Sequence, residues 1–142
     1  MNGPIGYAIR TESFNAAHRL HSKQLSDEEN KQVYGKCNNP NYHGHNYKWT
    51  VTLRGPVDLQ TGMIYNIAEL KHAMQQIMID IDHKNLDLDV EYFYKKVSTT
   101  ENLTIYLWES ITQLVPRELV HEVKVEETEK NSFVFRGEYS SK

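Results

Sequence analysis

The stretch 47-YKWTVTLR-54 decides the fold class, because its residues alternate strictly between apolar and polar side chains. Its odd-numbered positions hold Tyr, Trp, Val and Leu, and its even-numbered positions hold Lys, Thr and Arg. Side chains two apart in an extended chain share a face, so this pattern predicts a β-strand with one buried face. An apolar sheet face must be covered by a second layer.

Three further segments have strand patterns. One alternating segment runs from about residue 7 to residue 14, and two shorter ones lie at residues 123–125 and 133–135. The polar segment 129-EKNS-132 separates the last two, so we expect them to form a hairpin. Two strands therefore precede, and two follow, the middle of the chain.

A first amphipathic helix is predicted between the strand pairs. It begins at 66-NIAE-69, where Asn66 can cap the helix, and its apolar positions continue on one face to residue 81. We expect this helix to end at Asp82 and His83.

A second helix is predicted from 98-STTE-101, where Ser98 and Glu101 have the spacing of a capping box, and Pro116 stops it. The predicted order is ββααββ, which gives an α+β domain with a four-stranded antiparallel sheet and two helices packed on one face. Such a sheet leaves two open edges, so we expect a homo-oligomer.

Length and composition set limits on the function. The 142 residues suit a single domain over 1–142. The net charge of −3 and the lack of a basic, aromatic-rich cluster argue against nucleic acid as a partner. The N-terminal segment has no signal-like apolar core and no apolar run approaches ~18 residues, which argues against membrane partners. We expect a soluble, cytoplasmic protein.

Three histidines are candidate metal ligands. His43 and His45 in 43-HGHNY-47 share a face if the segment is extended, and a strand pairing could bring His18 beside them. Three neutral imidazoles with one position left open are typical of a catalytic zinc site. The alternative is that these are ordinary surface or core histidines.

Two further motifs could move protons. Cys37 is the only cysteine of the chain, and it follows Lys36 in a polar loop. A thiol near a cation can act as a base or nucleophile, whereas the alternative is a small buried side chain. Asp82 and His83 could form a proton relay, or they could be an ordinary polar helix end.

Glu127 is an unusual carboxylate. It has the same strand parity as Val123 and Val125, so it is predicted on the face that should be apolar. A carboxylate there requires hydrogen-bond donors, which a ligand with a pair of N–H groups could supply.

Taken together, these residues closely resemble the 6-pyruvoyl-tetrahydropterin synthase family over nearly the whole chain. The resemblance rests on several segments: 26-SDEEN-30, 34-YGKCNNPN-41, 43-HGHNY-47, 82-DHKNLD-87 and 98-STTEN-102. It implies a T-fold (tunnelling fold), in which two trimers stack into a homohexamer. It also implies a zinc-dependent lyase of tetrahydrobiopterin biosynthesis. The implied reaction converts 7,8-dihydroneopterin triphosphate to 6-pyruvoyl-tetrahydropterin and eliminates triphosphate.

The resemblance also implies a role for each motif. His18, His43 and His45 would hold Zn²⁺, and Cys37 would accept a proton. Asp82 and His83 would form an acid/base pair contributed by a neighbouring subunit.

Substrate-binding residues follow from the same resemblance. Glu127 would anchor the amino-pyrimidine edge of the pterin, with Thr99, Thr100 and Glu101 nearby.

Two other functions share some of these features. A 6-carboxy-tetrahydropterin synthase of queuosine biosynthesis would use the same zinc, thiol and dyad, but the long segment 21-HSKQLSDEENKQVYGK-36 favours the pyruvoyl enzymes. A non-enzymatic zinc- or pterin-binding module would need neither Cys37 nor the Asp82-His83 pair.

Overall fold

The computed structural model describes residues 2–141 and contains a five-stranded sheet. The strands are β1 (Asn2–His18), β2 (His43–Asp58), β3 (Lys84–Asn85), β4 (Val120–Glu126) and β5 (Ser132–Phe135), in the order β3-β1-β2-β4-β5. The four predicted strands are confirmed, and each is antiparallel to its neighbour among them. The sequence did not indicate β3, a two-residue strand parallel to the end of β1.

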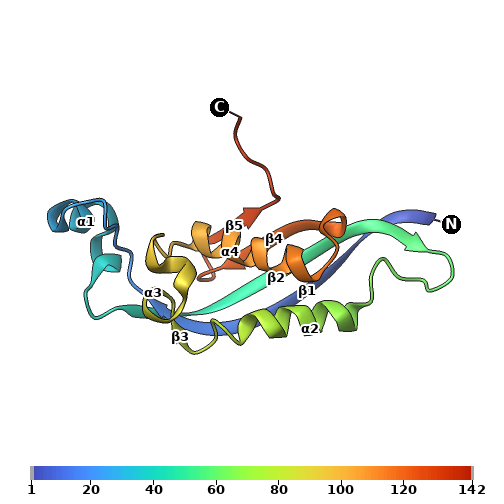
Figure 1. Cartoon of the computed structure of the whole chain (residues 1–142), viewed down its shortest axis with the longest axis horizontal. Helices are drawn as coiled ribbons and strands as arrows, with labels where there is room; N and C mark the ends of the chain where they lie inside the picture. The colour runs from blue at the N-terminus through green and yellow to red at the C-terminus, as the bar shows by residue number, and fades with distance from the viewer. Residues whose placement is uncertain (1, 142) are drawn as a thin grey trace.

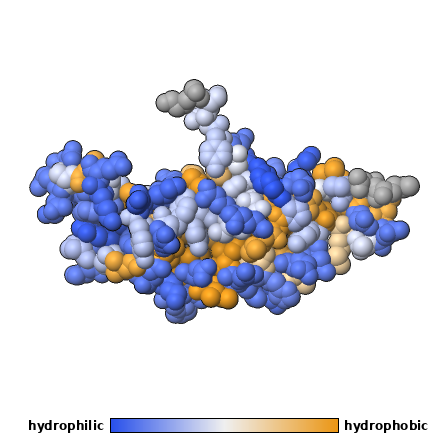
Figure 2. Space-filling view, viewed as in Figure 1, coloured by the Kyte–Doolittle hydropathy of each residue, from blue (hydrophilic) through white to orange (hydrophobic). Residues whose placement is uncertain are grey.

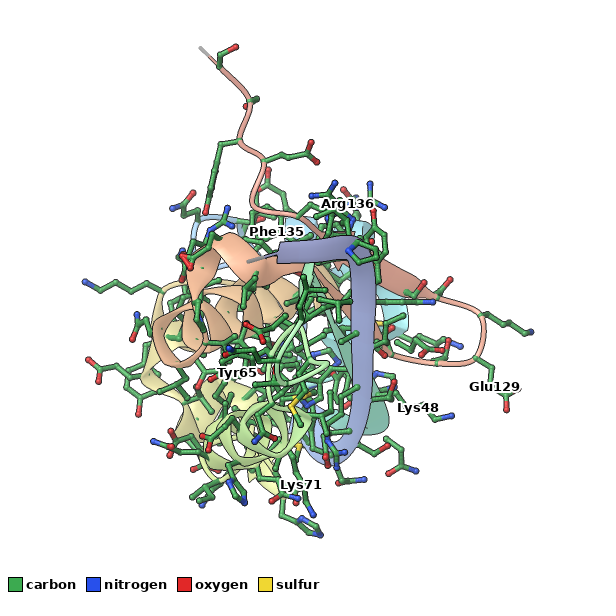
Figure 3. The ribbon with its side chains drawn as sticks, turned by 90° about the vertical axis from the view of Figure 1, so that its right-hand side faces the viewer. Lys48, Tyr65, Lys71, Glu129, Phe135 and Arg136 are labelled. Carbon is green, nitrogen blue, oxygen red and sulfur yellow. The ribbon has the colours of Figure 1, made fainter. Side chains whose placement is uncertain are left out.

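The helices are α1 (Asp27–Tyr34), α2 (Ile67–Met78), α3 (Leu86–Asp89) and α4 (Thr100–Leu114), with 3₁₀ helices at Gly35–Asn38, Glu91–Tyr94 and Arg117–Leu119. Of these, α2 and α4 cover one face of the sheet, whereas α1 lies beyond the ends of the strands (Figure 1). The two long helices, α2 and α4, are the two that the sequence predicts. In the view along the strands, they lie on one side of the sheet and Lys48 projects from the other (Figure 3).

The core lies between the sheet and the two long helices. Tyr47, Trp49, Val51 and Leu53 of β2 are all 0% exposed, as their alternation predicts. From the helix layer, Leu70 and Met74 of α2 and Leu103, Leu107 and Ile111 of α4 are also 0% exposed. On the face seen in Figure 2, hydrophobic surface gathers near the middle, while the α1 end is mostly hydrophilic.

The first long helix ends earlier than predicted. Its N-cap is Asn66, as expected, but α2 stops at Met78 rather than at Asp82 and His83. The chain then turns, because the main-chain N–H of His83 donates to the carbonyl of Asn15 in β1 at 2.5 Å. His83 has a φ of 62°, which a right-handed helix cannot accommodate. The prediction of the helix end was therefore wrong.

The second long helix begins one residue later than the predicted capping box. Thr99 is the N-cap of α4, and its hydroxyl accepts from the Asn102 N–H at 3.1 Å. Ser98 is not the cap, because its buried hydroxyl has no hydrogen-bond partner among residues 2–141 and the Thr99 carbonyl accepts the first helical bond, from the Leu103 N–H. The predicted end before Pro116 is confirmed.

Helix α1, which the sequence patterns above do not predict, has a complete capping box. The Ser26 hydroxyl accepts from the Glu29 N–H at 3.1 Å, and the Ser26 N–H donates to the Glu29 carboxylate at 2.9 Å. The spacing of these two residues in 26-SDEEN-30 is the signal that could have predicted this helix.

The outer edge of β1 is open along most of its length. β3 pairs only with Ala16 and Ala17, so residues 2–15 have no strand beside them on that side within the described chain. Ile5, Tyr7 and Ile9 of the same strand are more than half exposed. Among residues 2–141, no helix has the length and apolar character needed to cross a membrane.

Candidate active site

The register of β1 and β2 brings the three histidines together. His18 pairs with His43, and Ala16 pairs with His45, at the end of the two strands. One ring nitrogen from each of the three histidines lies within 4.8 Å of the other two. The predicted convergence of these imidazoles on one point is confirmed.

The surroundings of His18 leave one ring nitrogen available. Its Nδ1 lies 2.6 Å from the carbonyl of Ser98, so this nitrogen carries the proton and Nε2 keeps its lone pair. Burial is the main cause that lowers the pKa of His18, and the nearby His43 and His45 lower it further. Burial likewise lowers the pKa of His45. A neutral imidazole oriented by a carbonyl, as His18 is, fits a ligand of a divalent transition metal.

Tyr47 lies beside this cluster, and its hydroxyl is 3.4 Å from Nε2 of His18. Burial raises the pKa of the Tyr47 phenol, so the hydroxyl stays protonated at neutral pH. The cluster is therefore bounded on this side by a neutral donor.

Glu127 lies closer to the histidines than the sequence indicated. Its Oε1 is 3.7 Å from Nε2 of His45 and 3.9 Å from Nε2 of His18. The Thr100 hydroxyl donates to the same oxygen at 2.9 Å. The carboxylate is 21% exposed, so it can still accept from a ligand on its open side.

The three candidate residues at the start of α4 make different contacts. Thr100 touches Glu127, whereas Thr99 uses its hydroxyl to cap the helix and Glu101 is exposed in the first turn. No sequence pattern links Thr100 to Glu127, because the two are 27 residues apart.

Cys37 lies on the 3₁₀ helix Gly35–Asn38 and is half-buried. Its carbonyl accepts from the Leu20 N–H at 2.9 Å, which ties this segment to the chain just after His18. Cys37 is not among the ligand atoms that converge in the histidine cluster. The main chain of Cys37 is therefore tied to the segment that follows His18, but its sulfur does not belong to the group of converging ligand atoms.

Asp82 and His83 form the predicted pair. Asp82 Oδ1 lies 3.0 Å from His83 Nδ1, and the same oxygen accepts from the Asn15 N–H at 2.9 Å. The side chains of His83 and Asp82 are 82% and 40% exposed, whereas that of His18 is 1% exposed. The pair therefore presents its imidazole to the outside of this subunit.

Comparisons with known proteins agree on one family. A family model described as 6-pyruvoyl tetrahydropterin synthase matches residues 7–138. A 6-pyruvoyl tetrahydrobiopterin synthase from Poecilia reticulata is 57% identical over 135 residues, which are 94% of this chain and 92% of that protein. The enzyme of the same name from Drosophila melanogaster is 54% identical over 138 residues, covering 96% of this chain and 82% of that protein. The solved structure of Caenorhabditis elegans 6-pyruvoyl tetrahydropterin synthase matches with a TM-score of 0.94 at 49% identity, covering 97% of this chain and 99% of that chain.

Proposed function

The chain belongs to the 6-pyruvoyl tetrahydropterin synthase family, with its T-fold and its lyase activity, and we propose that its substrate is 7,8-dihydroneopterin triphosphate. The reaction eliminates triphosphate and yields 6-pyruvoyl-tetrahydropterin. The observation that carries this proposal is the three-histidine cluster with Glu127 beside it, in a chain 57% identical to an enzyme of this name. The 6-carboxy alternative has no such support.

We propose Zn²⁺ as the metal of the histidine cluster. His18, His43 and His45 supply three nitrogen ligands, which is the donor set of catalytic zinc sites with an open position. When bound, zinc would polarise the side-chain hydroxyls of the substrate and make the neighbouring C–H protons more acidic. The Ser98 carbonyl orients His18 by accepting a hydrogen bond from its Nδ1–H.

Glu127 is the proposed anchor of the pterin ring. Its open side can accept a pair of N–H groups from the amino-pyrimidine edge, as a carboxylate does in bidentate pairing. Thr100 holds one oxygen of the carboxylate in place, and Thr99 fixes the start of the helix that carries Thr100. Glu101 is proposed as a second pocket carboxylate.

Cys37 and the Asp82-His83 pair are the proposed proton carriers. Cys37 accepts the proton of a substrate C–H bond, and Asp82 with His83 returns or removes protons at the hydroxyls. The exposure of the His83 side chain supports its use by a neighbouring subunit, since it faces outward in its own. We therefore propose a homohexamer, a dimer of trimers, that closes the open edge of β1. We also propose a cytoplasmic location and a single domain over residues 1–142.

Product identification tests the function directly. The purified protein, loaded with zinc, is incubated with 7,8-dihydroneopterin triphosphate under anaerobic conditions and the products are identified by mass. We expect 6-pyruvoyl-tetrahydropterin and inorganic triphosphate. A 6-carboxy product, or unchanged substrate with a fully zinc-loaded protein, would contradict the proposal.

A further inference from the structure

Two hollows are lined by Arg19, which directly follows His18, and in both of them cations outnumber carboxylates. The larger, which we call the lysine hollow, has a volume of about 560 Å³ and lies between the segment after β1 and the segment before α4. Its charged lining residues are Arg19, Lys23, Asp87, Lys95 and Lys96. Its size is typical of a small-molecule site, and its surplus of cations favours an anionic ligand.

The cations of the lysine hollow are not neutralised by the protein. Asp87 accepts from the main-chain N–H of Arg19 at 2.7 Å, not from the guanidinium. Lys23 donates to the carbonyl of Tyr94 at 2.9 Å, which is a neutral partner. Within residues 2–141, none of the four cations forms an ion pair. Their charge is therefore available to a ligand.

The lysine hollow lies beyond the histidines on the side away from Glu127. Glu126 pairs with Lys48, and β2 begins at His43, so Glu127 lies beside the inner part of the site and His43 lies at the strand end. Tyr42, which directly precedes His43, lines the hollow. The hollow is therefore at the end of β2 that carries the histidines, one residue beyond His43.

The walls of the hollow are chain neighbours of the histidine site. Arg19 follows His18, and Val97 precedes Ser98, whose carbonyl orients His18. Tyr42 has a φ of 69°, a left-handed conformation that is uncommon for a residue with a bulky side chain. Backbone strain of this kind concentrates at ligand sites, where the fold holds a side chain in place.

We propose that the lysine hollow binds the triphosphate group of the substrate, with Arg19, Lys23 and Lys95 as its cations. The proposal rests on the proposed function, and it adds the residues that recognise the leaving group. Lys96 is the less available cation, because its ammonium lies 4.7 Å above the ring of Tyr92.

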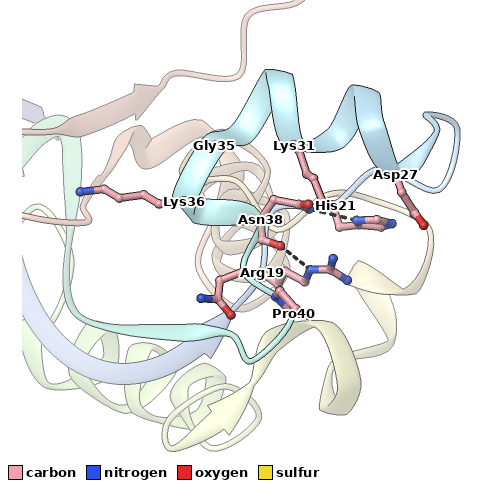
Figure 4. A pocket seen from close by; sticks show the side chains of 9 residues that line it. Arg19, His21, Asp27, Lys31, Gly35, Lys36, Asn38 and Pro40 are labelled. Atoms are coloured by element: carbon pink, nitrogen blue, oxygen red, sulfur yellow. Dashed lines mark hydrogen bonds between the residues drawn. The ribbon is translucent and has the colours of Figure 1, made fainter.

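The second hollow is a poorer candidate for the same group. It has a volume of about 460 Å³, and its charged lining residues are Arg19, Asp27, Lys31 and Lys36, so it has one cation fewer than the lysine hollow. Figure 4 shows Lys36 pointing away from the other lining side chains. Arg19 lines both hollows, and its Nε donates to the Asn38 carbonyl at 2.9 Å. Lys31 therefore distinguishes this hollow from the lysine hollow.

Binding of inorganic tripolyphosphate to the zinc-loaded native assembly tests the location. Isothermal titration compares the unchanged protein with Lys95→Ala in the lysine hollow, Lys31→Ala in the second hollow and Lys71→Ala on α2 in neither. All three lysines are exposed, so each variant should fold. We expect Lys95→Ala to weaken tripolyphosphate binding about ten-fold, as loss of a charge-assisted hydrogen bond implies, and the other two to change it less than about two-fold.

Two results would overturn the proposal: unchanged tripolyphosphate affinity in Lys95→Ala, or an equal loss in Lys31→Ala. Kinetics with the full substrate separate this from the proposed function. We expect Lys95→Ala to raise KM while it leaves zinc content unchanged. If the unchanged protein makes the pyruvoyl product but Lys95→Ala shows native KM and native tripolyphosphate affinity, only the phosphate site is wrong. If the unchanged protein makes no product, the proposed function itself fails.

Discussion

At the histidine cluster, the three ligands come from two strands that pair through fifteen residues, so the protein holds the site in place before any metal binds. Replacing one ligand by Ala leaves two imidazoles, too few to retain zinc. We expect His43→Ala and His45→Ala each to lose zinc while the circular dichroism spectrum stays native. His72→Ala, on the exposed surface of α2, is the matched control and should keep its metal. Full zinc occupancy in the His43→Ala, His45→Ala double variant, measured by metal analysis, would contradict the assignment.

Replacing Cys37 should reduce turnover without reducing the binding of zinc or substrate. If the thiol accepts a substrate proton, Cys37→Ala should retain zinc and bind substrate but lose about 10²–10⁴-fold in turnover, the usual contribution of a general base. Cys37→Ser should also be slow, because an alcohol gives up its proton far less readily than a thiol. A side chain kept only for packing predicts a lower melting temperature with turnover nearly intact. Single-turnover measurements on the zinc-loaded variants decide between these outcomes.

The sequence predicted that the three histidines converge, but it did not predict the contacts of Glu127. His18, His43 and His45 follow from strand parity and one strand pairing, both of which are local rules. The contact of Glu127 with His45 and the hydrogen bond from Thr100 depend on how the β4 end meets the start of α4. That arrangement is set by tertiary packing, which no spacing in the sequence encodes.

Among the elements, α1 offers the clearest test of local structure. Ser26 and Glu29 form a capping box, and the N–H of Ser26 lowers the pKa of the Glu29 carboxyl. Ser26→Ala should weaken the helix by about 1 kcal/mol, or about five-fold in the protection of its amides from hydrogen exchange. Gln32→Ala on the exposed side of the same helix is the control and should leave protection unchanged. Equal protection in both variants would show that packing, not the cap, holds α1.

The same contact predicts how α1 responds to acid. A carboxyl whose pKa is lowered on folding stabilises the fold above its unfolded pKa, and that stabilisation disappears as the pH falls through the lowered value. In the unchanged protein, the protection of α1 should therefore decline in acid before that of α4. In Glu29→Gln, which has no carboxyl at this position to titrate, this acid-dependent part should be absent, and amide exchange at a series of pH values can measure it.

Element boundaries were harder to predict than the elements. The apolar periodicity placed α2 and α4 correctly, because both bury one face on the sheet. It could not show that α2 stops at Met78, since the turn depends on the hydrogen bond from His83 to Asn15, which is 68 residues earlier. The two-residue strand β3 was missed for a different reason: it is too short to have a period.

At the scale of the whole molecule, the open edge of β1 and the exposed Ile5, Tyr7 and Ile9 predict association of subunits. Closed symmetry with six copies gives a native mass about six times the chain mass of 16.6 kDa. Light scattering at micromolar concentration measures this mass. A monomer would contradict both the edge argument and the family expectation.

Exposure of the Asp82-His83 pair leads to the sharpest test of how subunits build the site. If each site combines Cys37 of one subunit with His83 of a neighbour, two inactive variants can complement one another. When Cys37→Ala and His83→Ala subunits are unfolded together and reassembled in equal amounts, about a quarter of the sites should contain both native residues, as random mixing within a closed oligomer requires.

The matched control pairs Cys37→Ala with His43→Ala, because both residues belong to the same subunit of each site. In that mixture every site lacks either the thiol or a zinc ligand, so no activity should return. Recovery should then depend on the pair that is mixed and not on reassembly itself. If Cys37→Ala and His83→Ala also fail to complement, while unchanged subunits regain activity after the same treatment, then the dyad and the thiol act within one subunit. The exposed position of His83 would in that case require the 79–83 turn to move toward its own histidine cluster during turnover.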